Sequence, residues 1–230
     1  MMGVMKKFKA VIFDLDDTLY PEIDYVKSGF KVVSHYLSTK INMKPCKIFN
    51  NLLKLFEEDR NNVFNRLLDS YDVNKEVVIK ECIDLYRNHY PNITLDEEIQ
   101  EILKFIKLKT LKVGIITDGR PEGQWNKIKA LELQKYCDDI IVTDELGGIK
   151  YRKPSEIPYK KMLQELEIEA KEAIYVGDNP VKDFIAANKL GIFTVMFKNN
   201  KGLYSQTNNL SSEYLAKITI NKISEIRNLI

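Results

Sequence analysis

Short apolar runs that stop abruptly on polar residues recur along this chain, and they define its expected strands. The first is Ala10-Val-Ile-Phe13, which stops at Asp14. Three further runs, rich in β-branched residues, also stop on polar residues or glycine: 112–119, 139–145 and 173–178. Unbroken apolar runs of this length are typical of strands that are buried on both faces of a parallel sheet.

Helical patterns separate these expected strands. Apolar residues recur at helical spacing in two stretches, at Trp125, Ile128, Leu131 and Leu133, and at Val181, Phe184, Ile185 and Leu190. Alternating strands and helices predict an α/β fold, a doubly wound, Rossmann-like parallel sheet. Ligands of such sheets bind beyond the carboxyl ends of the strands, which is where the polar residues of this pattern fall.

One connection is far too long for a single crossover helix, because the second strand begins only near Leu111. Helical patterns fill the gap, at 25–37, 46–58, 61–68 and 75–89, and Pro91 closes the last of them. The sequence therefore predicts a catalytic core of residues 1–19 and 93–230 with an inserted helical domain of residues 20–92. A helix over 95–107 returns to the core, and a surface loop at 199–212 precedes a last strand near 217–220.

Composition narrows the function classes. The 230 residues are 44% hydrophobic and 30% charged, as in an ordinary water-soluble protein. A net charge of +2 gives no electrostatic case for nucleic acid or a membrane surface, and no window approaches the ~20 apolar residues of a membrane span. Three cysteines without CxxC spacing favour a reducing compartment, so we expect a cytoplasmic protein. His35 and His89 have no Cys or His partners at the spacing of zinc ligands.

Four polar segments carry the candidate chemistry, and each follows an expected strand or lies in the adjoining loop: Asp14-Leu-Asp16-Asp17-Thr18, Thr117-Asp118-Gly119, Lys153-Pro154, and Gly177-Asp178-Asn-Pro-Val-Lys-Asp183. If all four lie at the same edge of the sheet, they meet in one cleft. In an extended chain, Asp14 and Asp16 project to the same side and therefore face the cleft together. Asp17 projects to the other side, so we expect it to have a structural role in the loop.

So many carboxylates in one cleft require a cation. Two unit charges ~4 Å apart repel by about 4 kcal/mol at an effective dielectric of about 20. All-oxygen ligands suit Mg²⁺, which prefers one or two carboxylates together with substrate phosphate. A metal ion and Lys153 would make an anion site, and Thr117 and backbone N–H groups at the start of the next helix add donors for phosphoryl oxygens.

These four segments, in this order and spacing, resemble the motifs of the haloacid dehalogenase superfamily, specifically its phosphatase branch with a helical cap of the C1 type. The resemblance covers essentially the whole chain. It implies that Asp14 is the nucleophile and Asp16 the general acid and base. It also implies a Mg²⁺ ion held by Asp14, by Asp16 through its backbone carbonyl, and by Asp178, with Asp183 supporting the metal shell and orienting Lys153. The implied phosphate-binding residues are Thr117, Asp118, Gly119 and Lys153.

The resemblance favours phosphoryl chemistry over dehalogenation, because dehalogenating members lack the second aspartate of the first motif, here Asp16. The leading hypothesis is a Mg²⁺-dependent phosphatase of a small phosphorylated metabolite, either a sugar phosphate or a nucleoside monophosphate. A phosphomutase similar to β-phosphoglucomutase, a phosphate-sensing signalling module and a catalytically inactive scaffold are the alternatives. Asp118 departs from the pattern, since many members have Asn there.

The sequence does not rank the residues that select the substrate. The expected helical domain offers four candidates: Tyr20, Tyr25, Phe30 and His35. Arg120, directly after the phosphate-binding turn, is a further candidate, whereas Trp125 starts an apolar helical stripe and is expected to pack. The choice between a monomer and a homodimer stays open.

Overall fold

The computed structural model describes residues 8–198 and 210–230. The chain forms two compact units, one made of Met1–Glu22 and Thr94–Ile230 and the other of Ile23–Ile93. The sequence-based boundaries, 19/20 and 92/93, lie within a few residues of this division. None of the helices in the described ranges is long and apolar enough to cross a membrane.

The first unit is built on a parallel sheet, which has six strands within the described ranges: β1 (Ala10–Phe13), β2 (Lys112–Thr117), β3 (Asp139–Val142), β4 (Ala173–Gly177), β5 (Phe193–Phe197) and β6 (Ile218–Ile220). Their order is β3-β2-β1-β4-β5-β6. This order confirms the predicted doubly wound α/β fold. Phe13 pairs with Ile115 of β2 and with Val176 of β4, so the chain leaves β1 between the ends of these two strands.

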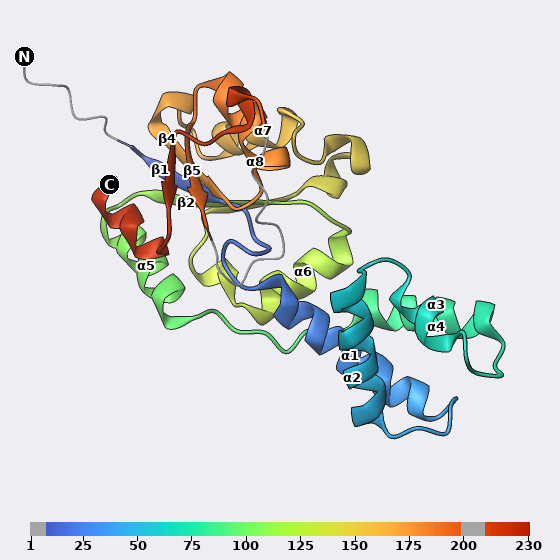
Figure 1. Ribbon diagram of the computed structural model, residues 1–230. Helices are drawn as coiled ribbons and strands as arrows, with labels where there is room; N and C mark the ends of the chain where they lie inside the picture. The colour runs from blue at the N-terminus through green and yellow to red at the C-terminus, as the bar shows by residue number, and fades with distance from the viewer. Residues whose placement is uncertain (1–7, 199–209) are drawn as a thin grey trace, which may run out of the picture. The chain divides into compact units, whose positions relative to one another are not determined.

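Helices cover both faces of the sheet. In Figure 1, α7 (Ile157–Glu165) and α8 (Pro180–Leu190) lie on one face, and α5 (Glu97–Leu108) and α6 (Pro121–Ala130) lie on the other. Buried side chains of α7 and α8 pack against alternate residues of the strands, in a cluster that includes Ile12, Ile116, Tyr159, Met162, Tyr175 and Phe184. Short 3₁₀ segments complete the unit: η1 (Leu133–Lys135), η2 (Thr143–Leu146), η3 (Ile149–Tyr151), η4 (Ala170–Glu172), η5 (Ser212–Tyr214) and η6 (Ile223–Asn228).

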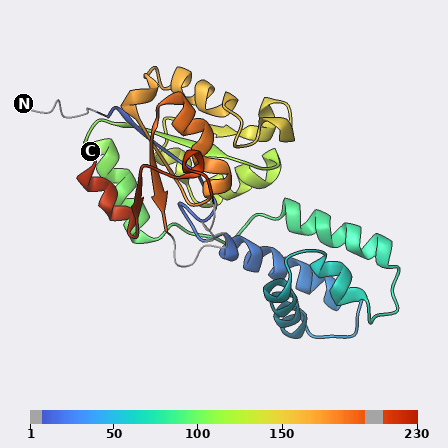
Figure 2. The ribbon, with the colours of Figure 1, turned by 45° about the horizontal axis from the view of Figure 1, so that its top comes forward.

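The second unit is helical and has its own hydrophobic core. Figure 2 shows its helices gathered together: α1 (Glu22–Ser38), α2 (Pro45–Glu58), α3 (Val63–Leu68) and α4 (Lys75–Asn88). Their apolar faces meet in a cluster that includes Val33, Leu37, Ile48, Leu52, Leu68 and Cys82. The backbone N–H of Asn92 donates to Ser28 Oγ at 2.8 Å, so the two ends of the insertion lie side by side. This unit is the inserted helical domain that the sequence predicts.

Two elements of the structure were not singled out by the hydrophobic pattern. Strand β5 is a short run that starts only two residues after Gly191, the left-handed residue that ends α8. Helix α7 begins with Ile157-Pro158 and carries few apolar residues in a regular period. The predicted loop at 199–212 lies mostly outside the described residues, because the description stops at Lys198 and resumes at Leu210.

Candidate active site

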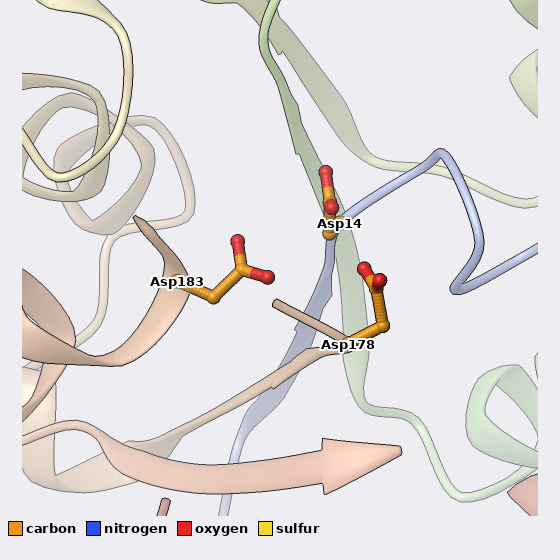
Figure 3. A group of neighbouring side chains, drawn as sticks. All are labelled: Asp14, Asp178 and Asp183. Atoms are coloured by element: carbon orange, nitrogen blue, oxygen red, sulfur yellow. The ribbon is translucent and has the colours of Figure 1, made fainter. Parts of the chain in front are cut away.

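Three buried carboxylates converge at the carboxyl edge of the sheet. Asp14 follows β1, Asp178 follows β4, and Asp183 lies in the first turn of α8. One oxygen from each lies within 4.8 Å of the others. Figure 3 shows the side chain of Asp183 reaching from α8 toward Asp14 and Asp178. The structure therefore brings Asp14, at the end of the first strand, together with Asp178 and Asp183, more than 160 positions later in the sequence.

Lys153 balances part of this negative charge. Its side chain is fully buried, and its Nζ lies 2.6 Å from Asp14 Oδ1 and 2.8 Å from Asp183 Oδ1. Burial alone would lower the pKa of Lys153, but the charges of Asp14 and Asp183 outweigh it and hold this pKa well above its usual value. Lys153 is therefore a permanent cation, which a buried lysine can be only beside such partners.

The Asp183 carboxylate accepts hydrogen bonds at both of its oxygens. Its Oδ1 accepts from Lys153 Nζ and from Tyr175 Oη at 3.1 Å, and its Oδ2 accepts from the backbone N–H of Asn179 at 2.9 Å. Tyr159 Oη also donates to its backbone carbonyl at 2.8 Å. These bonds fix the Asp183 carboxylate against Lys153, which is the arrangement of a residue that orients the lysine.

Asp14 and Asp178, in contrast, have unmet capacity for a cation. Asp14 Oδ2 is buried and accepts no hydrogen bond, and although Lys182 Nζ lies 3.4 Å away, it is not aligned to donate one. Asp178 accepts one bond, from Thr18 Oγ1 at 3.2 Å. Burial and the charges of Asp14 and Asp183 raise the pKa of Asp178 to about 9. This all-oxygen, electron-rich pair fits a hard cation such as Mg²⁺.

The carboxylate of Asp16, which was predicted to face the cleft with Asp14, is not among these three grouped carboxylates. It faces α6 instead, where Lys127 Nζ lies 2.7 Å from Oδ1 and Gln124 Nε2 donates to Oδ2 at 3.0 Å. Tyr20 Oη donates to Oδ1 as well. Burial on its own would raise the pKa of Asp16, but Lys127 and these donors lower it to about 2.

The predicted phosphate-binding turn follows β2. Thr117 is fully buried, and its Oγ1 accepts a hydrogen bond from Gln124 Nε2. The Asp118 carboxylate accepts from Thr143 Oγ1 at 2.9 Å and from the backbone N–H of Lys153 at 3.1 Å. Both bonds end on Asp118 Oδ1, so this carboxylate holds the loop that carries Lys153 against the turn.

Gly119 lies in the same turn, and its backbone conformation is one that favours glycine. Its φ of +146° lies in the region that side chains other than glycine rarely adopt, and a Cβ there would lie 3.0 Å from Gln124 Cγ. Glycine at this position therefore allows α6 to approach the turn closely.

The remaining candidates contact less of the site. Asp17, with φ +59°, accepts a hydrogen bond from the backbone N–H of Glu22 at 2.8 Å. Arg120 is exposed at the start of α6. Trp125 is half-buried, and its Nε1 donates to Glu145 Oε1 at 2.7 Å.

Sequence reasoning missed four residues that shape the site: Gln124, Lys127, Tyr175 and Lys182. Gln124 and Lys127 are three positions apart on the helix that directly follows the Thr117 turn. Their spacing puts both side chains on one face of this helix, and this could have indicated that both contact the same group. Tyr175 lies inside an apolar strand and Lys182 in a charged helix turn, and neither position differs from an ordinary core or surface residue in the sequence.

Comparison with known proteins identifies the family. Residues 11–197 match the family model described as haloacid dehalogenase-like hydrolase. This chain belongs to the haloacid dehalogenase-like hydrolases. The assignment confirms the resemblance of the four motifs and makes the protein a hydrolase.

Haloacid dehalogenase-like relatives that align over most of both chains are phosphatases. A glyceraldehyde 3-phosphate phosphatase of Methanocaldococcus jannaschii is 28% identical over 96% of this chain and 96% of its own length. One from Pyrococcus furiosus is 30% identical over 86% of this chain and 83% of its own. The pyrophosphatase PpaX of Bacillus mycoides is 26% identical over 82% and 83% of the two chains. The chain is accordingly a phosphoric monoester hydrolase of this family.

Solved structures show the same fold. A haloacid dehalogenase superfamily hydrolase of subfamily IA from Geobacter sulfurreducens superposes with a TM-score of 0.69 at 19% identity, over 96% of each chain. The magnesium-bound hydrolase YfnB of Bacillus subtilis also reaches a TM-score of 0.69, at 15% identity over 97% of this chain and 98% of its own. Both comparisons support the sheet with an inserted helical unit.

Proposed function

We propose that this protein is a Mg²⁺-dependent phosphatase that hydrolyses a small phosphorylated metabolite through a phosphate ester of Asp14. The observation that carries the proposal is the environment of Asp14: one oxygen is held 2.6 Å from Lys153 Nζ, and the other is buried without a hydrogen bond. A carboxylate held in this way is oriented, and its second oxygen, with Lys182 Nζ 3.4 Å away, has no hydrogen bond that a metal ion would have to displace.

The roles of the other residues follow from their positions. Asp14 and Asp178 would hold the Mg²⁺ ion, together with the backbone carbonyl of Asp16. The ion would supply positive charge for the phosphoryl oxygens and for the developing charge of the reaction. Lys153 and Thr117 would bind phosphoryl oxygens, and the backbone N–H groups of Asp118 and Gly119 lie in the same turn.

The direction of the Thr117 hydroxyl supports its role. Because Thr117 Oγ1 accepts from Gln124, its own O–H hydrogen stays available to donate to another acceptor. A phosphoryl oxygen above the turn is such an acceptor.

The chemistry divides between two aspartates. Asp14 would attack phosphorus through a carboxylate oxygen, a nucleophile that needs no separate base. Asp16 would give a proton to the leaving oxygen and later take one from water, a role that contributes ~10²- to 10⁴-fold. The helical unit would act as the cap that encloses the substrate.

The substrate proposed is a small sugar phosphate or a nucleoside monophosphate. The relatives named glyceraldehyde 3-phosphate phosphatase support the first class, since the one from Methanocaldococcus jannaschii aligns over 96% of both chains. Glyceraldehyde 3-phosphate is therefore the first compound to test, and pyrophosphate is the second because of the PpaX relative.

The test is phosphate release from these two compounds, from other sugar phosphates and from nucleoside monophosphates, with Mg²⁺ or EDTA. We expect turnover that needs Mg²⁺ and that is lost in Asp14→Asn. Asp69→Asn is the matched control, because this carboxylate is exposed on the helical unit and pairs with Lys75 at 3.6 Å. Turnover that persists in EDTA or in Asp14→Asn would overturn the proposal.

A further inference from the structure

A tyrosine hydroxyl lies beside the ammonium of Lys153, below the carboxylates of the site. Tyr175 is the middle residue of β4, and its side chain is fully buried. Its Oη donates to Asp183 Oδ1 at 3.1 Å and accepts from Lys153 Nζ, also at 3.1 Å. Because a phenol hydroxyl can both donate and accept, this one group bonds to Lys153 and to Asp183 at the same time.

The hydroxyl of Tyr175, and not its ring, is the feature that needs an explanation. The ring packs against that of Tyr159 with the centroids 5.0 Å apart, and its centroid lies 5.8 Å from Lys153 Nζ, within the range of a cation–π contact. A phenylalanine would keep both contacts. A buried hydroxyl costs free energy unless it is hydrogen-bonded, so tyrosine differs from phenylalanine here by its bonds to Lys153 and Asp183.

These bonds fix the direction of the Lys153 ammonium. Its three N–H groups can rotate together about the last bond of the side chain. One of them donates to Asp183 Oδ1 at 2.8 Å and a second donates to Tyr175 Oη. The third is left for Asp14 Oδ1, which lies 2.6 Å from the same nitrogen, or for a phosphoryl oxygen bound beside Asp14.

We infer that Tyr175 is a positioning residue whose hydroxyl keeps the Lys153 ammonium turned toward Asp14 and the phosphoryl site. Because Tyr175 is fully buried, it acts through Lys153 and not by touching the substrate. The inference rests on the proposed phosphatase function and adds one residue to its site. It predicts that loss of the hydroxyl weakens the binding of a phosphoryl group, although the ring stays in place.

A second buried tyrosine provides the matched comparison. Tyr159 is also fully buried, and its Oη donates to the backbone carbonyl of Asp183, not to the Lys153 ammonium. Tyr175→Phe and Tyr159→Phe each remove one buried hydroxyl and keep the ring. A general disturbance of the core affects both variants alike, whereas the positioning of Lys153 is lost in Tyr175→Phe.

The test is the affinity for inorganic phosphate in the presence of Mg²⁺, measured by titration calorimetry and therefore without turnover. For Tyr175→Phe we expect the Kd for phosphate to rise about 10-fold and kcat/KM to fall about 10-fold or more, because one oriented donor to the phosphoryl oxygens is lost. For Tyr159→Phe we expect the Kd for phosphate to change less than about 3-fold, because Lys153 keeps its orientation.

The effect of the metal ion on stability separates positioning from a general disturbance. Addition of Mg²⁺ should raise the melting temperature of Tyr175→Phe as much as that of the wild type, because the metal-binding pair Asp14 and Asp178 is unchanged. Three results would show a general structural role and overturn the inference: a lost Mg²⁺ shift, an equal rise of the Kd for phosphate in both variants, or a Tyr175→Phe protein that does not fold.

The proposed function and the positioning role fail separately. If the wild type shows no metal-dependent turnover, or if Asp14→Asn stays active, the phosphatase function fails and the positioning role fails with it. If the wild type is active, Asp14→Asn is inactive and Tyr175→Phe binds phosphate as tightly as the wild type, only the positioning role fails.

Discussion

At the scale of single residues, buried ion pairs hold the carboxylates of the site in place. Asp14 and Asp183 are each held by Lys153, and Asp16 is held by Lys127. The Lys153 and Lys127 side chains are almost fully buried, so these pairs lie largely out of contact with solvent. Removing one member of such a pair therefore affects stability as well as activity.

Lys153→Met tests this coupling. It leaves the carboxylates of Asp14 and Asp183 buried without their shared cation, which is expected to lower the free energy of unfolding by about 3–5 kcal/mol. Urea denaturation without Mg²⁺ measures it. Lys160→Met is the control, because Lys160 is an exposed residue that pairs with Glu156 at 2.7 Å on the surface. A variant as stable as the wild type would contradict the assigned ion pairs.

Glu22 makes the stability of the folded protein depend on pH. Burial, and next the negative charge of Asp16, raises the pKa of Glu22 to about 7 from an ordinary value of 4.5. Between these two values the folded protein keeps a proton that the unfolded chain has lost, so stability falls as pH rises, by at most ~1.4 kcal/mol per pH unit.

The measurement for Glu22 compares the wild type with Glu22→Gln by urea denaturation at several pH values from 5 to 8. As pH rises through this window, the wild type should lose stability relative to Glu22→Gln. A difference that does not change with pH would contradict the raised pKa.

Residue by residue, the sequence predicts the site unevenly. Asp14, Lys153 and Asp178 follow or adjoin apolar strands, so their convergence could be expected from the sheet alone. Lys127 could not, because a lysine in an amphipathic helix is normally solvated, and only its contact with Asp16 in the folded protein keeps it buried.

At the scale of elements, the junction between β4 and α8 sets the geometry of the carboxylates. Gly177 ends β4, and Asp183 lies in the first turn of α8. Asn179 caps α8 by accepting from the backbone N–H of Val181 at 3.1 Å. The strand and the helix are thus fixed against each other within a few residues.

Gly177→Ala tests how tightly this junction is packed. A Cβ at Gly177 would lie 2.6 Å from Asp183 Oδ2, so Asp183 or the backbone would have to move. We expect a loss of stability of ~1–3 kcal/mol, as for overpacking, together with reduced phosphate release. Thermal denaturation and the phosphate assay measure the two effects. Unchanged values in both would show that the junction has more room than the structure gives it.

Elements could be predicted where they are long or repeat a clear pattern. The helices of the inserted unit and strands β1, β2 and β4 follow from hydrophobic periodicity. Strand β5 did not, because five residues directly after a helix end give too short a pattern to separate from the helix itself. Its position depends on pairing with β4, a contact that no local pattern contains.

At the scale of the whole molecule, a metal ion would change the charge balance of the site. Asp14, Asp178 and Asp183 bring three carboxyl groups into one cluster, and Lys153 lies against Asp14 and Asp183. A ligand that binds only the folded state stabilises it by about 2.7 kcal/mol at 100 times its Kd. We therefore expect Mg²⁺ to raise the melting temperature and EDTA to reverse this effect.

Asp178→Asn should abolish the Mg²⁺ effect on the melting temperature, and Asp69→Asn should preserve it. A wild type whose melting temperature does not respond to Mg²⁺ at any concentration up to the millimolar range would contradict the assigned metal site.

The central claim is that Asp14 carries the phosphoryl group during turnover. The most direct measurement is to quench the enzyme with acid while it turns over substrate with Mg²⁺, and to locate any added phosphoryl group on its peptides by mass spectrometry. The account predicts a phosphoryl group on the peptide that contains Asp14, and none in Asp14→Asn. Rapid turnover with an unmodified Asp14 peptide, or with the phosphoryl group on another residue, would contradict it.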